Sequence, residues 1–262
     1  MQRRELYTRA WINRKKESPR APELRLRGIC IMLEFSNSWG TEMPDLDTHL
    51  HLEMLRTYKK QNTFVRRLRR AVREVVSPSK FYGMQWGDPE SSGPQLFMRD
   101  RYILPYVKPD HVALEIGPGG GRWTRYLLGF RRLYVVDYHA ELLQELRRRF
   151  DKPNMQFIVN NGTDFPGVPE DSVDYVLSIA CFVHLDVHLI AAYLKNIAAI
   201  LKPGGNAVLT YSDKTKVGAQ INATFSENTP ERMREMVKQA GLRVVEEDLT
   251  ILWHSGLIRI SH

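Results

Sequence analysis

Cysteine and long apolar runs are scarce in this chain of 262 residues. Only two cysteines occur, Cys30 and Cys181, which are too few for a disulfide framework. The longest apolar stretch, Val173 to Leu185, contains Asp174 and falls far short of the roughly 20 residues needed to cross a bilayer. The first thirty residues lack the apolar segment of a signal peptide. These absences predict a cytoplasmic protein without a membrane span.

Positive charge is in excess, but it is unevenly distributed. The net charge is +8, and residues 1–30 alone hold nine basic and three acidic residues, which leaves +2 for the rest. Such a tail can dock on phosphates or anionic lipid. It nevertheless lacks interleaved aromatic residues and a recognisable reading element. Because prolines and a glycine also interrupt any period, residues 1–45 are interpreted as a basic, disordered leader.

The next segment, residues 46–94, changes character. Apolar residues recur at helical spacing between Asp47 and Val76, and an arginine-rich cluster, Arg66 to Arg73, covers the other side. This cluster is interpreted first as a solvated helix face and second as an attractant for an acidic acceptor. Ser77 and Pro78 end the helix, and a loop of turn residues follows. The pattern predicts a helical extension and linker that acts as a lid.

Residues 95–262 alternate regularly between helix-like and strand-like segments. Helices are expected over 95–106, 122–128, 140–150, 188–201 and 230–240, and strands over 112–116, 133–136, 155–159, 175–179, 206–211, 242–251 and 257–260. Such alternation is typical of right-handed crossovers and a parallel sheet covered on both faces. The last two strands have only a short link and should form an antiparallel edge hairpin. The predicted fold is a Rossmann-like α/β domain with a mostly parallel, seven-stranded sheet.

A glycine-rich loop follows the first expected strand. Gly117, Gly119 and Gly121 allow sharp turns and close approach of the backbone to a ligand, and free amides at a following helix start would favour an anionic group. A nicotinamide-binding loop would place its third glycine where this chain has Arg122. The spacing therefore favours a different nucleotide-like cofactor.

An acidic residue, Asp137, ends the second expected strand, 20 residues after Gly117. A carboxylate there can accept hydrogen bonds from both hydroxyls of a ribose, as in dinucleotide-binding folds. The alternative is a cap on the helix that begins at Ala140. The two roles are compatible.

Together with four further motifs, these features resemble class I S-adenosylmethionine-dependent methyltransferases, especially the small-molecule enzymes of sugar, polysaccharide and natural-product pathways. The resemblance extends from about Tyr82 to the C-terminus. The six motifs are Leu114 to Thr124, Val136-Asp137, Asn160 to Gly162, Ser172 to Val176, Phe182 to Asp186, and Leu201 to Gly205.

The resemblance implies S-adenosylmethionine as the cofactor and assigns residues to it. The glycine loop would hold the methionine portion and Asp137 the ribose. The family's acid at the adenine amino group is replaced here by Asn161, so that either Asn161 or Asp164 would make this contact. The expected cofactor residues are Glu115, Gly117, Pro118, Gly119, Gly121, Asp137, Asn161, Gly162, Asp164 and Ser178.

His184 is the expected general base, because it follows the fourth strand on the ligand side and imidazole titrates near neutral pH. The alternative is a wall of the acceptor pocket. Asp186, His188 and Tyr211 are lesser candidates, and Asp186 could instead cap a helix. Cys181 is interpreted as a packing residue. No residue set has the spacing of a zinc or metalloprotease site, so no metal is expected.

The predicted function is O-methylation of a small-molecule acceptor, such as a sugar or natural-product hydroxyl. The first alternative is an RNA or protein methyltransferase that uses the basic N-terminal region. Against it, Ser178 to Cys181 lacks the Asn/Asp-Pro-Pro-aromatic sequence used for exocyclic base amines. The second alternative is an inactive scaffold that binds S-adenosylmethionine. The sequence predicts no particular oligomeric state.

Overall fold

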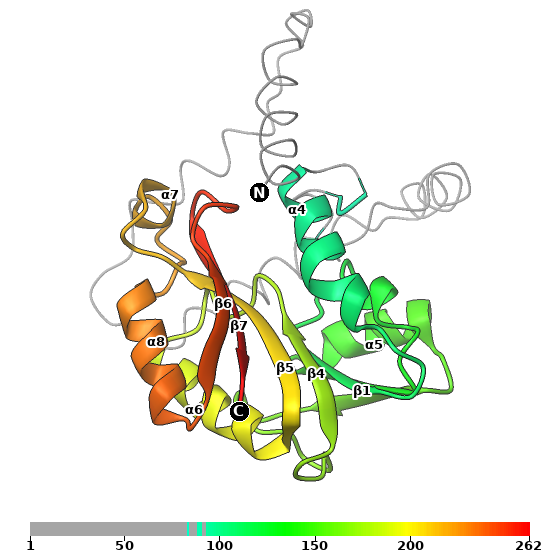
Figure 1. The fold of residues 1–262 in the computed structure, drawn as a ribbon. Coiled ribbons are helices and arrows are strands. Elements are labelled where there is room, and N and C mark those ends of the chain that lie inside the picture. Colours follow the sequence, from blue (N-terminus) through cyan, green and yellow to red (C-terminus); the bar gives the residue numbers. More distant parts are fainter. Residues whose placement is uncertain (1–82, 84–87, 91–92) are drawn as a thin grey trace, which may run out of the picture.

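A seven-stranded sheet in the order β3-β2-β1-β4-β5-β7-β6 forms the centre of the protein (Figure 1). The computed structural model describes Gly83, Asp88–Glu90 and residues 93–262. The expected leader over 1–45 and nearly all of the expected extension over 46–94 lie outside these residues. The strands are β1 Val112–Ile116, β2 Arg132–Asp137, β3 Met155–Val159, β4 Val173–Ser178, β5 Leu201–Ser212, β6 Arg243–Asp248 and β7 Ser255–Ser261.

The strand pairing confirms the predicted fold. The first five strands run parallel, with Leu114 of β1 paired to Tyr134 on one side and to Val176 on the other. β7 runs antiparallel to both β5 and β6 and lies between them. At Gly256 of β7, a Cβ atom would lie 2.4 Å from the ring of Tyr211 on β5, so only glycine fits there.

Helices cover both faces of the sheet (Figure 1). They are α4 Gly93–Met98, the π-helix η4 Arg99–Ile103, the 3₁₀ turns η5 Leu104–Tyr106 and η6 Thr124–Tyr126, α5 Ala140–Phe150, α6 Val187–Ile200, α7 Val217–Gln220 and α8 Pro230–Gln239. One core packs α6 and α8 against the sheet, and the other packs α4, η4 and α5 against its opposite face. The result is a three-layer sandwich.

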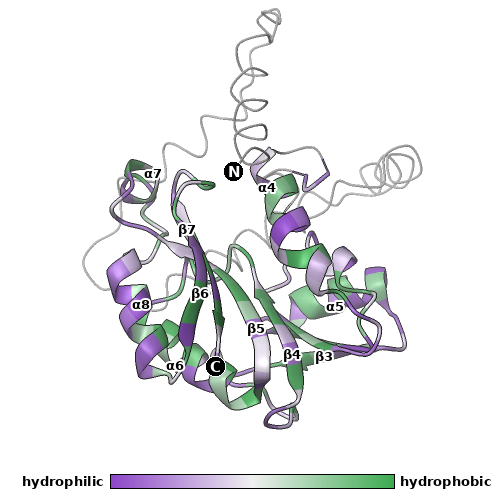
Figure 2. Ribbon diagram, viewed as in Figure 1, coloured by the Kyte–Doolittle hydropathy of each residue, from purple (hydrophilic) through white to green (hydrophobic). Residues whose placement is uncertain are grey.

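Hydropathy follows these layers (Figure 2). β4 is largely hydrophobic because both of its faces are covered. α8 is amphipathic: Met233 and Val237 are buried, whereas its charged residues face outward. Its start is marked by Pro230 in the first turn and by Thr229, whose side chain accepts a hydrogen bond from the Arg232 amide.

The expected helix over 122–128 is wrong. The chain forms turns there, with only the short η6 inside them. Trp123 and Leu127 are instead buried in the core beside α5. The glycine loop therefore does not lead into an α-helix, and the helix dipole expected to attract an anion is absent from this part of the chain.

Two elements differ from the sequence prediction in their form or bounds, and each difference has a physical reason. The expected helix over 95–106 consists of α4, η4 and η5 in succession, with Pro105 in the final 3₁₀ turn, where its ring prevents regular α-helical hydrogen bonding. β5 begins at Leu201, earlier than expected, because Val173 at the start of β4 pairs with it before a register shift.

No helix in the described part of the chain is long and apolar enough to cross a membrane.

Candidate functional site

The glycine loop lies where the carboxyl ends of the parallel strands meet, the edge at which open α/β sheets bind ligands. Gly117 and Gly121 have φ of +66° and +87°, in the left-handed region. A Cβ atom at Gly117 would lie 2.7 Å from Cβ and Sγ of Cys181, and one at Gly121 would lie 2.4 Å from the ring of Phe150. The loop is therefore bare backbone, packed on one side and lacking side chains at both bends.

Arg122 provides a positive charge immediately after the loop. The residue is 7% exposed, and its guanidinium lies 5.4 Å from the ring centroid of Trp123. Burial, together with the nearby Arg125, lowers its pKa to about 10, so that it remains protonated at pH 7. The sequence prediction missed Arg122. Its signal was a basic residue directly after the third glycine.

Two buried carboxyl groups end neighbouring strands at this edge. Glu115 accepts a hydrogen bond from Thr124 Oγ1 at 2.6 Å, and burial raises the pKa of Glu115 to about 8. Burial raises the pKa of Asp137 to about 7, although its Oδ1 accepts a hydrogen bond from the His139 amide at 2.9 Å. The N-cap of α5 is His139, so the interpretation of Asp137 as that cap is wrong. Both acids are costly to bury and suit hydroxyl or ammonium donors.

Asn161 and Asp164 form hydrogen bonds to each other within the loop after β3. The side-chain oxygen of Asn161 accepts hydrogen bonds from the amides of Thr163 and Asp164, at 3.0 and 3.1 Å. Asp164 Oδ1 in turn accepts the Asn161 amide at 2.9 Å. Asn161 thus uses its only acceptor atom to close the turn, whereas Asp164 has a second carboxylate oxygen.

Tyr138 flanks the same loop and was also missed. It follows Asp137 directly, is 46% exposed, and its ring lies 3.7 Å from the position of a Cβ atom on Gly162. Gly162 itself has φ of +104°. An exposed aromatic ring beside a bare turn is a surface on which a planar group can lie.

The segment after β4 begins with strained backbone. Ala180 has φ of +64°, and its amide donates to Thr210 Oγ1 at 2.8 Å. Ser178 is fully buried, and its hydroxyl donates to the Ile116 carbonyl at 3.0 Å, which joins the ends of β4 and β1. The Ser178 hydroxyl therefore serves the scaffold of the site, and Ala180 is the exposed residue.

His184 is half-buried. It closes a turn that begins at Cys181, in which the His184 amide donates to the Cys181 carbonyl at 3.0 Å. Its Nδ1 lies 3.0 Å from the Thr224 carbonyl oxygen. A carbonyl can only accept, so Nδ1 carries the proton and Nε2 carries the lone pair. Burial lowers the pKa of His184 below its usual value. The imidazole is therefore neutral at pH 7, with Nε2 as its basic atom.

The lesser base candidates are less suitable. Tyr211 is buried and donates its hydroxyl proton to Glu247 at 2.7 Å, and burial and Glu247 raise its pKa. Asp186 occupies the N-cap position of α6 without a side-chain capping bond, and His188 is exposed on the first turn of that helix. Of these residues, only His184 combines burial with a defined basic atom.

The described part of the linker lies against η6. Asp88 accepts a hydrogen bond from Arg125 at 2.7 Å, and Glu90 accepts one from the Tyr126 hydroxyl and pairs with Arg99 at 2.7 Å. Asp88 and Glu90 are thus held against η6 and η4.

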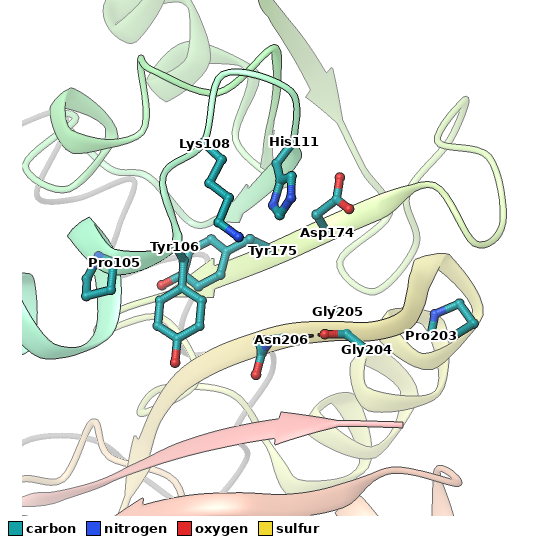
Figure 3. Close-up of a pocket in the computed structure, with 10 residues that line it drawn as sticks. All are labelled: Pro105, Tyr106, Lys108, His111, Asp174, Tyr175, Pro203, Gly204, Gly205 and Asn206. Atoms are coloured by element: carbon teal, nitrogen blue, oxygen red, sulfur yellow. Dashed lines mark hydrogen bonds between the residues drawn. The ribbon is translucent and has the colours of Figure 1, made fainter.

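A separate hollow of about 380 Å³ lies at the opposite, amino ends of β1, β4 and β5 (Figure 3). Lys108 and His111 lie on one side of it and the backbone of Gly204 and Gly205 on the other. Asp174, which also lines it, pairs with Lys202 at 2.9 Å. None of the expected cofactor residues lines it.

Within the ranges that the structure describes, no group of three or more His, Cys, Asp or Glu residues is arranged to hold a metal ion.

A known family shares the sequence around this site. Residues 113–205 match the family model described as a methyltransferase domain. The chain contains a class I S-adenosylmethionine-dependent methyltransferase domain. Its cofactor is S-adenosylmethionine, and it transfers a methyl group to an acceptor. The matched segment includes every residue expected to contact the cofactor.

Solved structures show that the methyltransferase domain has a common fold. An S-adenosylmethionine-dependent methyltransferase from Mesorhizobium loti superposes with a TM-score of 0.56 at 12% identity, covering 66% of this chain and 99% of that one. One from Clostridium acetobutylicum gives 0.53 at 12% identity, covering 76% and 99%. The CcbJ methyltransferase from Streptomyces caelestis gives 0.51 at 15% identity, covering 61% and 92%. No curated protein matches the chain.

Proposed function

We propose that the protein methylates a hydroxyl group of a small-molecule acceptor, with His184 as the general base. The observation that carries this proposal is the position and tautomer of His184. The Cys181–His184 turn starts against Gly117, and the Nδ1 contact with Thr224 makes Nε2 the proton acceptor. A hydroxyl acceptor loses a proton during transfer, and an imidazole with a lowered pKa is ready to take it at neutral pH.

The residues at the donor end fit S-adenosylmethionine. Its carboxylate would meet the Gly119 amide and the buried cation of Arg122, which replaces the expected helix dipole, because the Gly121 amide already donates to the Pro118 carbonyl at 3.0 Å. Its ammonium would face the Glu115 side of the loop, with Pro118 shaping the bend. Asp137 would accept hydrogen bonds from the ribose hydroxyls.

Asp164 is our choice for the adenine amino group. Its Oδ1 holds the Asn161 amide, which leaves Oδ2 as an acceptor, whereas the Asn161 oxygen already accepts two amides of its own turn. Tyr138 and Gly162 would flank the adenine ring. Ser178 would contribute indirectly, by fixing the ends of β1 and β4.

When bound, S-adenosylmethionine supplies a methyl group on a positively charged sulfur, an intrinsically reactive electrophile. The task of the chain is to align the acceptor, exclude water and receive one proton. Ala180 exposes backbone at the end of β4, and His184 Nε2 receives the proton. The extension over 46–94 would act as a lid over the acceptor. Of its described residues, Asp88 and Glu90 contact Arg125 and Tyr126 of η6.

Replacing His184 with Ala tests this function. We expect turnover to fall by about 10²- to 10⁴-fold, the usual contribution of a general base, while the affinity for S-adenosylmethionine stays unchanged. His188→Ala, an exposed imidazole nearby, is the control and should keep full turnover. Unchanged turnover in His184→Ala would exclude the base role and leave His184 as a pocket wall.

Two alternative functions, an RNA methyltransferase and an inactive scaffold, would give different experimental results. Binding of generic RNA that is strong at about 50 mM salt and falls steeply with added salt would favour the RNA methyltransferase. That alternative rests on residues 1–30 and Arg66 to Arg73, which lie outside the described residues. S-adenosylmethionine binding without transfer to any acceptor would favour the scaffold.

A further inference from the structure

Three loops that are distant in sequence meet beside His184. They follow β4, follow β5, and connect β6 to β7. The Ser226 amide donates to the Val183 carbonyl at 2.9 Å, which joins the first two. The ammonium of Lys216 donates to the carbonyls of Leu252 and Ser255, at 3.0 and 2.6 Å, which joins the last two. The loops therefore form one connected wall.

Four rings line up along this wall, and we name them the aromatic row: Trp253, His254, Phe225 and His184. Ring centroids are 5.6 Å apart for Trp253 and His254, 5.2 Å for His254 and Phe225, and 5.2 Å for Phe225 and His184. Each pair is edge-to-face, with interplanar angles of 71°, 80° and 83°. The row is continuous from the exposed Trp253 to the half-buried His184.

The outer end of the row is apolar and exposed. Trp253 is 65% exposed, and Val217 and Ile221, at or next to α7, are 69% and 70% exposed. A Cβ atom at Gly218 would lie 2.4 Å from the indole, so Trp253 packs closely on α7. Figure 1 shows α7 beside the β6–β7 connection. Large apolar side chains gathered in this way mark a surface that meets a ligand or partner.

The row carries no net charge at neutral pH. Burial lowers the pKa of both His184 and His254, and the nearby Lys216 lowers that of His254 further. The ammonium of Lys216 lies 3.5 Å from Asp213 Oδ2, so the two charges offset each other beside the row. Neutral rings beside an offset ion pair suit an uncharged aromatic ligand.

The basic atom of His184 also selects the kind of hydroxyl. A phenolic hydroxyl has a pKa of about 10, whereas an alcohol is about as weak an acid as water and has a much higher pKa. Because proton transfer is most efficient when donor and acceptor are closely matched, an imidazole whose pKa lies below 6.5 is much better suited to a phenol.

We infer that the acceptor is an aromatic hydroxyl compound whose ring lies along the aromatic row and whose hydroxyl reaches His184. The inference rests on the proposed O-methylation and narrows its substrate class. The phenolic proton passes to His184 Nε2, and the oxygen forms the bond to the methyl carbon. The carbon–sulfur bond breaks with its electron pair left on sulfur, which yields neutral S-adenosylhomocysteine, the aryl methyl ether and an imidazolium ion.

A matched pair of probes tests the substrate class. The full chain is incubated with S-adenosylmethionine and either 2-naphthol or decahydro-2-naphthol, which share a carbon skeleton and a hydroxyl but differ in aromaticity. We expect kcat/KM to be at least about 100-fold higher for 2-naphthol, measured as methyl ether formed. An equal or higher value for decahydro-2-naphthol would overturn the inference while leaving O-methylation in place.

A binding measurement separates this inference from the proposed function. Calorimetry with S-adenosylhomocysteine present should detect 2-naphthol, and Phe225→Leu and Trp253→Leu should each weaken it by about three- to tenfold, as expected for one aromatic contact. Leu104→Ala, an exposed apolar change on η5, is the control. If S-adenosylhomocysteine binds but 2-naphthol does not, the inference is wrong. Failure of the proposed function would instead appear as methylation of amines but of no hydroxyl compound.

Discussion

The donor and acceptor ends of the site are built in different ways. The proposed donor end uses backbone and carboxylates from three short stretches around Gly117, Asp137 and Asp164, all within the matched residues 113–205. The proposed acceptor end uses side chains of the aromatic row, and three of its four members, Phe225, His254 and Trp253, lie beyond that segment. In this proposal the cofactor meets backbone inside the family match, whereas the acceptor meets side chains that lie mostly outside it.

The largest expected effect tests the backbone at the donor end. Gly117→Ala combines a left-handed φ with a Cβ atom 2.7 Å from Cys181, and we expect it to weaken S-adenosylmethionine binding by about 100-fold or more, roughly 3 kcal/mol. Gly167→Ala is the control, because Gly167 has φ of +79° but no atoms within 4 Å of the added Cβ. Calorimetry that finds equal losses in both variants would mean that strain alone acts, without a role for the loop.

The next effect concerns the buried acid of the donor end. Asp137→Ala should weaken S-adenosylmethionine binding by about 5- to 150-fold, or about 1 to 3 kcal/mol, because the ribose hydroxyls lose their acceptor. Asp186→Ala, an exposed carboxylate at the acceptor end, should leave this affinity intact. Unchanged affinity in Asp137→Ala, measured by calorimetry, would refute the ribose assignment.

The pH dependence of turnover tests the role of His184 at the acceptor end. Burial lowers the pKa of His184 below 6.5, so the basic form persists to a lower pH than in free histidine. Turnover should be level above pH 6.5 and should fall about tenfold per unit below the lowered pKa, as Nε2 becomes protonated. His184→Ala should lose this acidic limb. A limb that survives in the variant would assign it to another group, such as His254 or the acceptor itself.

The smallest expected effect separates the two adenine candidates. Asp164→Ala should reduce by about fivefold the preference for S-adenosylhomocysteine over S-inosylhomocysteine, which lacks the adenine amino group, because one hydrogen bond is worth about 1 kcal/mol. Asn161→Ala should loosen the turn and weaken both ligands alike. Competition binding measures both ratios, and a preference lost only in Asn161→Ala would reverse the assignment.

Most of the sheet could be predicted from sequence, because buried parallel strands are short apolar runs separated by helices of clear period. α5 was predicted at its observed bounds, Ala140–Phe150, since Leu142, Leu143 and Leu146 repeat on one face with arginines opposite. The segment after the glycine loop was mispredicted. Its local pattern suits a helix. In the structure the segment forms a series of turns instead, and these turns bury Trp123 and Leu127 in the core beside α5.

Side-chain partners account for the remaining differences. Sequence placed Tyr211 among the possible bases, whereas in the fold its hydroxyl is bound to Glu247 across β7. Ser178 was expected to line the ligand site, yet its hydroxyl donates to Ile116. These pairings join residues 36 and 62 positions apart, and no local pattern in a single sequence carries that information.

The sequence by itself predicted the fold class and the donor loop, because these depend on periodicity and on the spacing of glycines, which are local properties. The cofactor followed from the resemblance of its motifs to a known family. Only the tertiary structure decided the tautomer of His184, the different hydrogen bonding of Asn161 and Asp164, and the existence of the aromatic row. Each of these depends on which atoms meet across loops, and such contacts arise only when the sheet brings distant segments to one edge.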